Sequence, residues 1–375
     1  MLPALGGLVI IGIHILEFTP DVPLESGGGG MMRHITGLAS FLRIEGHEVT
    51  IVSARAAASA PLPAGMVRAR GLGVLPLIRR ADVVHVHGGR MVEVALTACL
   101  AWVARKPFLY TPHAYYDTPL PRGTTTGQRA RQWLRTARKV AWDQVVERAL
   151  LRRGFRTIVL APFWVDYLRA RHLPVGRVAV IPNAVDLSVL EVLPRMPGTL
   201  PGSPALLTVG RLDEVKQVEV IIRALVVPGM EQAHLHVVGT GPDLGRLQGG
   251  AFRGGVAERV TWHGFVDDHR VAKMTASADA FVIASRQEGL PTTVLESLVR
   301  GTPVVASDIP PHRHILGVAG EQTLYRLGDV TDLARAAQMA AGRTVDDAAR
   351  ERVRVAFSWQ TNAGRILALY EEAVA

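Results

Sequence analysis

Cysteine is nearly missing from this sequence, and the shortage limits the kinds of protein that it can encode. Cys99 is the only cysteine in 375 residues, so no disulfide can form within the chain. Folds that are built without disulfides are typical of reducing compartments, and we therefore expect a cytoplasmic protein.

Long apolar runs are missing as well. The run 4–16 is apolar, but it has only thirteen residues and contains His14, whereas a helix needs about 20 apolar residues to cross a membrane. The run has no basic leader and no clear cleavage site, so it does not have the pattern of a signal peptide. We predict that it forms a buried first strand.

The remaining composition is typical of a globular protein with two domains. Hydrophobic residues make up 48% and charged residues 20% of the chain, which has 375 residues, more than one ordinary core holds. Residues 1–190 carry 23 Lys+Arg and 12 Asp+Glu, whereas residues 191–375 carry 19 and 21. A basic first half would suit nucleic acid, an anionic membrane or an acidic acceptor, and an arginine-rich genome would give the same bias.

Strand-like apolar runs alternate with helix-length segments along the chain. This alternation predicts an α/β protein with parallel, doubly wound sheets. In the first half we expect strands at 8–15, 48–53, 81–87, 107–111, 157–162 and 178–181, and helices at 34–44 and 91–103. The predicted organisation is a first domain at 1–192, a proline-rich linker at 193–204, a second domain at 205–358 and a last helix at 359–375.

Two glutamates, Glu288 and Glu296, are separated by seven residues around a predicted helix start. Pro291 suits the first turn of a helix, which would place Glu288 in the preceding loop and Glu296 about one and a half turns inside. A helix N-terminus between two carboxylates suits a ligand with phosphates in the middle and hydroxyls at both ends, such as a nucleotide sugar. The alternative is a capped surface helix with two solvated glutamates.

Two glycine turns upstream add further signals for phosphate. Gly210 ends an apolar run and is followed by Arg211 and Lys216, whose cationic groups could hold a diphosphate at the carboxyl end of a strand. A second strand-like run ends at Gly239 and Gly241, but the spacing G-x-G-x-x-x-G departs from a dinucleotide-binding fingerprint.

Together these segments resemble glycosyltransferase family 4, the retaining "glycosyl transferases group 1". The successive landmarks are "VGRLDEVKQVEVIIRAL", "LHVVGTGP", "VTWHGFVDD", "ASRQEGLPTTVLESLVRGTPVVASDIPPHRHI" and "FSWQTNAGRILALYEEA". The resemblance implies the GT-B fold, with two Rossmann-like domains facing across a cleft and the last helix packed back on the first domain. It also implies transfer of a hexose from a UDP- or GDP-sugar to a hydroxyl of a glycan or lipid-linked sugar, with retention at the anomeric carbon.

The resemblance also assigns roles to individual residues. Glu288 would hold the hexose hydroxyls, Glu296 the ribose, and Arg211, Lys216 and the backbone of Gly289 and Leu290 the leaving diphosphate. Gly210 and Gly241 would line the donor site. In the first half, Gly29 and Gly30 would line the cleft near the diphosphate and the acceptor, and His113 in the motif T-P-H would contact the reacting sugar.

His85 and His87 alternate on a predicted strand and therefore point to the same face of a sheet. A metal site would need further ligands, and none is obvious in the sequence, so we interpret His85 as a core or supporting histidine. Because no D-x-D motif stands near a suitable strand end, we expect no metal or other cofactor beside the donor, and we expect no nucleic acid partner.

The segment 122–156 is rich in arginine and contains Trp133 and Trp142. A basic helix with tryptophans can lie on an anionic membrane, which would suit a lipid-linked acceptor and peripheral attachment to the inner face of the cytoplasmic membrane. The alternative is an exposed helix whose long side chains pack on the protein.

Other functions remain open at this point. A nucleotide-sugar 2-epimerase of the same fold would need acid and base carboxylates, and a sugar phosphorylase would be a longer chain. A catalytically inactive partner subunit that binds a sugar nucleotide is a further alternative, although all the main donor-site residues are present.

Overall fold

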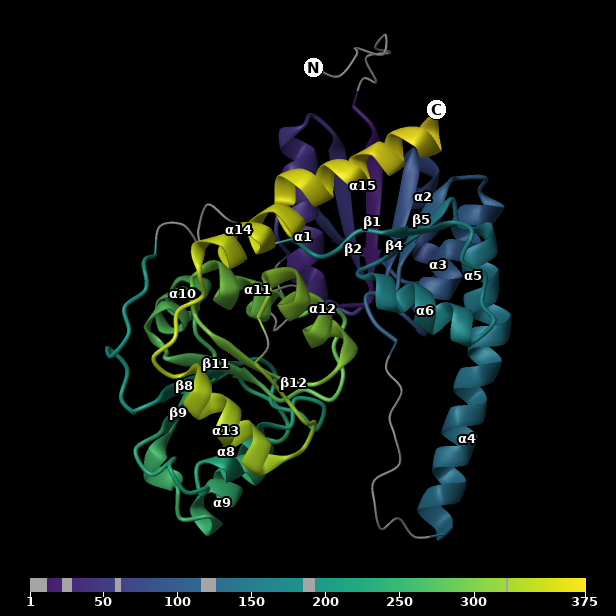
Figure 1. The fold of residues 1–375 in the computed structure, drawn as a ribbon. Coiled ribbons are helices and arrows are strands. Elements are labelled where there is room, and N and C mark those ends of the chain that lie inside the picture. Colours follow the sequence, from purple (N-terminus) through teal and green to yellow (C-terminus); the bar gives the residue numbers. More distant parts are fainter. Residues whose placement is uncertain (1–11, 22–28, 58–61, 116–125, 185–192, 322) are drawn as a thin grey trace. The chain divides into compact units, whose positions relative to one another are not determined.

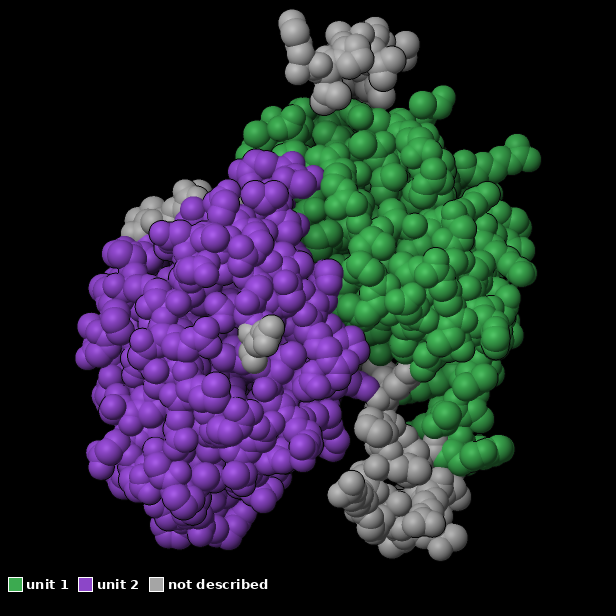
Figure 2. Space-filling view, viewed as in Figure 1, with its two compact units in different colours: residues 1–183, 362–375 green, residues 184–361 purple. Residues whose placement is uncertain are grey.

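A computed structural model describes residues 12–21, 29–57, 62–115, 126–184, 193–321 and 323–375 (Figure 1). For residues 126–132 it describes the backbone alone. The chain divides into two compact units, one of residues 1–183 with 362–375 and one of residues 184–361 (Figure 2).

Unit 1 is built on a parallel sheet of seven strands. The strand order is β3-β2-β1-β4-β5-β6-β7. The strands are β1 (His14–Thr19), β2 (Glu48–Ser53), β3 (Met66–Arg68), β4 (Val83–His87), β5 (Phe108–Thr111), β6 (Arg156–Val159) and β7 (Val178–Val180). The helices are α1 (Gly30–Ile44), α2 (Leu75–Arg80), α3 (Val92–Val103), α4 (Thr126–Trp142), α5 (Arg148–Arg153), α6 (Pro162–Ala170) and, from residue 362 on, α15 (Trp359–Val374), with a 3-10 turn at Gly71–Val74 and a π-helical turn at Asp143–Glu147.

The central strands of unit 1 are buried along their length because helices cover the sheet. All five residues of β4 are buried, and the core beside it includes Phe18 and Tyr110. Tyr370 of helix α15, drawn in yellow in Figure 1, is fully buried and hydrogen-bonds to Glu17 and His85 of the sheet. The C-terminal segment therefore completes the core of unit 1.

The predicted first strand was placed wrongly. The structure has β1 at His14–Thr19 rather than 8–15, and residues 8–11 lie outside the described residues. β1 pairs with β2 from His14↔Glu48 to Thr19↔Ser53, so the strand continues past Glu17. The prediction ended the strand before this residue because it followed the apolar run, and a glutamate interrupts such a run. The sixth strand ends at Val159, earlier than predicted, because Pro162 begins α6.

Unit 2 is built on a parallel sheet of six strands. The strand order is β10-β9-β8-β11-β12-β13. The strands are β8 (Ala205–Val209), β9 (His234–Val238), β10 (Val260–Gly264), β11 (Ala280–Ile283), β12 (Val304–Ser307) and β13 (Leu324–Tyr325). The helices are α8 (Val218–Ala224), α9 (Leu244–Arg253), α10 (Asp268–Ser277), α11 (Thr292–Val299), α12 (Pro310–Ala319), α13 (Val330–Ala340) and α14 (Asp347–Ala356), with a 3-10 turn at Ala257–Arg259.

Each sheet has one point at which the strand order reverses direction. In unit 1 the point lies between β1 and β4, and in unit 2 between β8 and β11. Open parallel sheets bind ligands outside the carboxyl ends of the strands at such a point. The predicted α/β class with doubly wound parallel sheets is confirmed in both units.

Among the described residues, no helix is both long enough and apolar enough to cross a membrane.

Candidate active site

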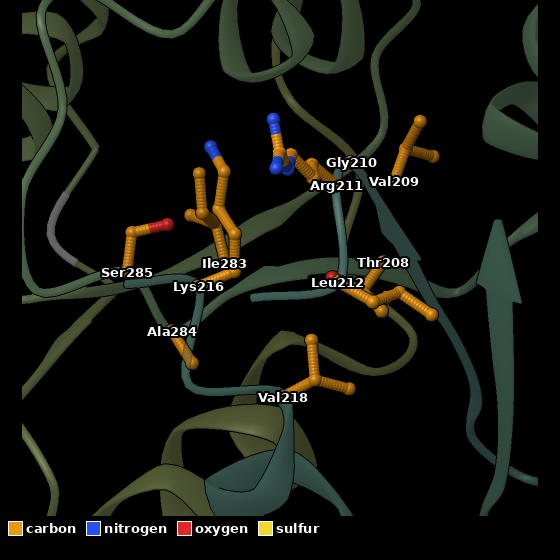
Figure 3. A pocket seen from close by; sticks show the side chains of 10 residues that line it. All are labelled: Thr208, Val209, Gly210, Arg211, Leu212, Lys216, Val218, Ile283, Ala284 and Ser285. Atoms are coloured by element: carbon orange, nitrogen blue, oxygen red, sulfur yellow. The ribbon is translucent and has the colours of Figure 1, made fainter. Parts of the chain in front are cut away.

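Two loops at the strand-order reversal of unit 2 form the candidate donor site. One follows β8 and carries Gly210, Arg211 and Lys216; the other follows β11 and carries Ser285 and Glu288. They are tied together by the backbone, where Arg286 N donates to Val215 O over 2.9 Å. A pocket lies at this place, lined by Thr208, Val209, Gly210, Arg211, Leu212, Lys216, Val218, Ile283, Ala284 and Ser285 (Figure 3).

Lys216 and Glu288 form an ion pair inside this site. The Nζ atom of Lys216 lies 2.5 Å from Oε1 of Glu288, and their side chains are 28% and 9% exposed. Burial alone would raise the pKa of Glu288, but the Lys216 ammonium, helped by Ser285 and His312, holds that pKa below its usual value. The sequence predicted separate roles for these two residues, and the structure brings their charged groups into contact.

The loop after β8 is shaped so that both cations reach the pocket. The carboxylate of Asp213 accepts hydrogen bonds from the backbone N–H groups of Val215 and Lys216 at 3.1 and 3.3 Å. The Arg211 side chain is 73% exposed, with Nε 3.7 Å from Asp213 Oδ2. In Figure 3 the nitrogen ends of Arg211 and Lys216 lie on the same side of the pocket, away from Val218. The arrangement offers positive charge to an anionic group.

Glycines let the neighbouring loops approach this one at backbone distance. A Cβ atom on Gly239 would lie 1.9 Å from Gly210 O, and one on Gly241 would lie 2.2 Å from Leu212 O. Leu212 N also donates to Thr240 O over 2.9 Å. No side chain fits at the two glycines, so backbone contacts set the position of the Arg211 loop.

The helix between the two glutamates begins one residue later than predicted. Pro291 is extended, with ψ 114°, and is the N-cap of α11, so the prediction that it lies in the first turn was wrong. The physical reason is that its carbonyl accepts from Val294 N while its own ψ stays outside the helical region. Gly289 is half-buried, and the Leu290 side chain is buried in the core. Glu296 is half-buried on the helix, beyond the first turn.

The predicted site residues of unit 1 lie at the carboxyl edge of its own sheet. Gly29 is the N-cap of α1 and Gly30 its first residue, so α1 starts earlier than the predicted 34–44; the rest of the glycine run, Ser26–Gly28, lies outside the described residues. His113 follows β5 with φ 60°, a left-handed conformation that non-glycine residues rarely adopt.

His113 is part of a buried cluster of polar side chains. Its Nε2 atom lies 3.0 Å from Nδ1 of His87, and Nε2 of His87 lies 2.5 Å from Oε2 of Glu17. The rings of His34 and His113 meet edge to face at 5.3 Å. Burial lowers the pKa of His113 well below its usual value, and it lowers the pKa of His87 to about 4 and that of His34 to about 3. These three histidines are therefore neutral at pH 7.

The comparisons with known proteins agree with this geometry. One family model, described as "Glycosyltransferase Family 4", matches residues 28–189, and a second, "Glycosyl transferases group 1", matches residues 203–341. The chain belongs to glycosyltransferase family 4.

Relatives of this family 4 glycosyltransferase act on different acceptors. It is 31% identical to 2-deoxystreptamine N-acetyl-D-glucosaminyltransferase of Streptomyces fradiae over 74% of this chain and 66% of that protein. It is 28% identical to phosphatidyl-myo-inositol mannosyltransferase of Mycobacterium tuberculosis over 95% of both proteins.

Solved structures share the fold of this glycosyltransferase. Sucrose-phosphate synthase from Thermosynechococcus elongatus has a TM-score of 0.75 at 21% identity, with 96% of this chain and 98% of that chain covered. Anabaena HepE in complex with UDP and glucose has a TM-score of 0.69 at 17% identity, with 96% of this chain and all of that chain covered. The predicted GT-B fold is thereby confirmed.

Sequence reasoning missed two buried residues of this glycosyltransferase. Glu17 is fully buried on β1 against His85 and His87, and a lone carboxylate inside the run from Ile13 to Phe18 was the available signal. His312 is fully buried on α12, where its Nδ1 lies 2.8 Å from Ser307 O, and it interacts electrostatically with Glu288.

Glu17 also supplies a third possible metal ligand beside the two histidines of the H-x-H pattern. The ligand atoms of Glu17, His85 and His87 lie within 4.8 Å of one another. The expectation that His85 is a core or supporting histidine agrees with its complete burial, with Nδ1 2.6 Å from Tyr370 Oη and Nε2 2.7 Å from Thr111 Oγ1.

Proposed function

We propose that this enzyme moves a hexose from a UDP- or GDP-sugar to a hydroxyl of a glycan or lipid-linked acceptor, with retention at the anomeric carbon. The observation that carries the proposal is the Lys216–Glu288 pair, which lies beside Arg211 at the strand-order reversal of unit 2. A leaving diphosphate needs cations, and a transferred sugar needs an acceptor for its hydroxyls. These loops offer both.

The roles follow from where charge develops during transfer. As the glycosidic bond breaks, negative charge grows on the diphosphate, and Arg211 and Lys216 would stabilise it more in the transition state than in the ground state. The start of α11, at Gly289 and Leu290, would add its partial positive charge. Gly210 and Gly241 would give the ligand room to approach the backbone. No metal ion is required in this scheme.

The two glutamates would hold the ends of the donor. Glu288, ionised and held by Lys216, would accept hydrogen bonds from the hexose hydroxyls. Glu296 would accept from the ribose. In unit 1, His113 would contact the transferred sugar, and Gly29 and Gly30 would line the approach of the acceptor.

A lipid-linked acceptor is supported by the exposed residues of helix α4 and by one group of relatives. Trp133, Leu134 and Val140 are 69%, 55% and 54% exposed, with Arg135 and Arg138 exposed among them. Apolar side chains beside arginines suit the surface of an anionic membrane. The phosphatidyl-myo-inositol mannosyltransferases are named for a lipid acceptor. A similar acceptor would suit peripheral attachment to the inner face of the cytoplasmic membrane, which we propose for this enzyme.

Release of free nucleoside diphosphate tests the proposed reaction. The purified chain is incubated with a panel of UDP- and GDP-sugars, with and without polyprenyl-diphosphate sugar and glycan acceptors, and the anomeric configuration of the product is read by NMR. We expect acceptor-dependent release and a retained configuration. An inverted product would contradict retention, and no release with any donor would contradict the function.

Variants connect the reaction to the site. Lys216→Met should lower kcat at least tenfold, whereas Lys273→Met, which removes an exposed lysine of α10 in the same unit, should leave it unchanged. Glu288→Gln should lower sugar-dependent turnover about tenfold or more, because a charge-assisted hydrogen bond is worth about 1.5–3 kcal/mol. Equal turnover in Lys216→Met and Lys273→Met would remove Lys216 from the mechanism.

A further inference from the structure

A chain of hydrogen bonds connects the core of unit 1 to the exposed edge of its sheet. It begins at Tyr370, whose hydroxyl donates to Glu17 Oε1 over 2.8 Å, and continues from Glu17 Oε2 to His87 Nε2 over 2.5 Å. The next bond joins His87 Nδ1 to His113 Nε2 over 3.0 Å. Glu17 and His87 are fully buried, and His113 is partly exposed. The chain therefore ends on a residue that a ligand can reach.

Only one assignment of donors and acceptors is possible for the hydrogen bonds between Glu17, His87 and His113. Burial would raise the pKa of Glu17, but His85 and His87 outweigh it and hold that pKa well below its usual range, so the carboxylate can only accept. His87 must therefore carry its proton on Nε2. Because His87 is neutral, its Nδ1 has a lone pair, and the proton of the next hydrogen bond must come from His113 Nε2.

We propose that Glu17 and His87 are positioning residues that fix His113 as the Nε2–H tautomer, so that its Nδ1 accepts a hydrogen bond from a hydroxyl of the transferred sugar. This inference rests on the proposed function, which places the sugar at His113. The left-handed backbone of His113, with φ 60°, fits such a role, since strained backbone is held where a side chain must be aimed.

The same atoms could be taken for a metal site, but the bonding favours a hydrogen-bonded chain. Both nitrogens of His85 and of His87 and both oxygens of Glu17 already have a partner within the cluster. The separation of 2.5 Å between His87 Nε2 and Glu17 Oε2 is that of a short hydrogen bond. Two ligands of one zinc ion would lie further apart, since each is about 2.0–2.2 Å from the metal at a tetrahedral angle.

The substitution Glu17→Gln should reverse the direction of the hydrogen bonds from residue 17 to His113. An amide can donate as well as accept, so the new side chain can place its NH₂ group against His87 Nε2. His87 would then carry its proton on Nδ1, and His113 would have to accept with Nε2 and carry its own proton on Nδ1. The atom that met the sugar as an acceptor would become a donor.

The experiment reads both the tautomer and the turnover. Histidine-selective ¹⁵N NMR of the full chain at pH 7.5, assigned with His113→Gln, reports which nitrogen of His113 carries the proton. We expect Nε2–H in the wild type and a mixed or reversed tautomer in Glu17→Gln. We expect kcat of Glu17→Gln to fall about tenfold with KM for the donor within twofold, and Glu17→Asp to retain the wild-type tautomer and an intermediate kcat.

Tyr370→Phe is the matched control. It removes the hydroxyl that bonds to Glu17 and to His85 in the same buried cluster, but it leaves the bonds from Glu17 to His87 and from His87 to His113 in place. We expect the tautomer of His113 to be unchanged and kcat to stay within about twofold. An equal fall of kcat in Tyr370→Phe and Glu17→Gln would show a structural effect alone and overturn the proposal.

Other outcomes separate this proposal from the proposed function. A wild-type His113 with its proton on Nδ1 overturns the inference even if no Glu17 variant folds. So does stoichiometric Zn²⁺ binding to the chelator-treated chain that is lost in Glu17→Gln. If the wild type transfers no sugar, the proposed function fails, and with it the role in sugar binding, whereas the NMR result still decides whether Glu17 and His87 fix the tautomer.

Discussion

The Lys216–Glu288 pair makes a quantitative prediction about stability and pH. Lys216→Met would leave the Glu288 carboxylate, which is 9% exposed, without the ammonium 2.5 Å away. Removing one partner of a buried pair costs about 3–5 kcal/mol. Because Lys216 is 28% exposed and water screens part of the interaction, we expect about 1–3 kcal/mol at pH 7.

The pH dependence of this difference distinguishes the ion pair from simple packing. In the wild type Lys216 lowers the pKa of Glu288, so the pair contributes stability above the unfolded pKa of about 4.5 that is lost as the pH falls through the folded pKa. In Lys216→Met, burial without the cation should raise the pKa of Glu288. The gap in free energy of unfolding between the two proteins should therefore widen from pH 4 to pH 7.

The assay is urea unfolding at a series of pH values, with several probes because a chain of two units need not unfold in one step. The double variant Lys216→Met/Glu288→Gln should be destabilised less than the sum of the single variants, with a coupling energy of about 1–2 kcal/mol. Lys273→Met is the control for loss of a lysine. A gap that is the same at pH 4 and pH 7 would refute the reasoning.

Three further predictions concern other parts of the chain. Glu296→Gln should weaken binding of the free nucleoside diphosphate in calorimetry, and unchanged binding would contradict the ribose assignment. Arg131→Glu/Arg135→Glu/Arg138→Glu should abolish flotation with anionic liposomes, since three basic residues add about 3 kcal/mol at low salt, and equal binding to neutral and anionic liposomes would contradict a membrane role. Burial raises the pKa of Glu147 to about 7, so the wild type loses stability as the pH rises through that value. In urea unfolding, the free energy of unfolding of Glu147→Gln should therefore rise relative to the wild type by up to about 3 kcal/mol between pH 5 and 8. A difference that stays constant over this range would contradict the raised pKa.

Local patterns were sufficient to predict the fold class and the loops of unit 2. Gly210 follows an apolar strand, and the cations after it lie at the carboxyl end of β8. The sequence predicts this because the strand end and the glycine turn are adjacent in the sequence. The exact start of α11 was harder, since a proline is accepted both in the first turn and just before it. The roles of these residues in binding remain predictions.

Contacts between distant residues could not be predicted in this way. Lys216 and Glu288 are 72 residues apart, and Glu17 and Tyr370 are 353 apart. Lys216 meets Glu288 because β8 pairs with β11, and Tyr370 meets Glu17 because the last helix docks on the sheet of unit 1. Neither arrangement is visible in a local pattern. Glu17 was missed because a hydrophobic pattern does not predict a buried carboxylate. Its burial is explained only by its partners, which are distant in the sequence.

The close backbone contacts at Gly239 and Gly241 bear on how the enzyme could be redesigned for other donors. The loop that carries Arg211 is held by main-chain atoms of its neighbours, which every residue type has, so its position is insensitive to most side-chain changes around it. The two glycines themselves are closed to substitution, whereas Thr240 between them is exposed. A library that seeks altered donor preference should therefore vary Thr240 and leave the glycines intact, because a side chain at either glycine would clash with the backbone of the Arg211 loop.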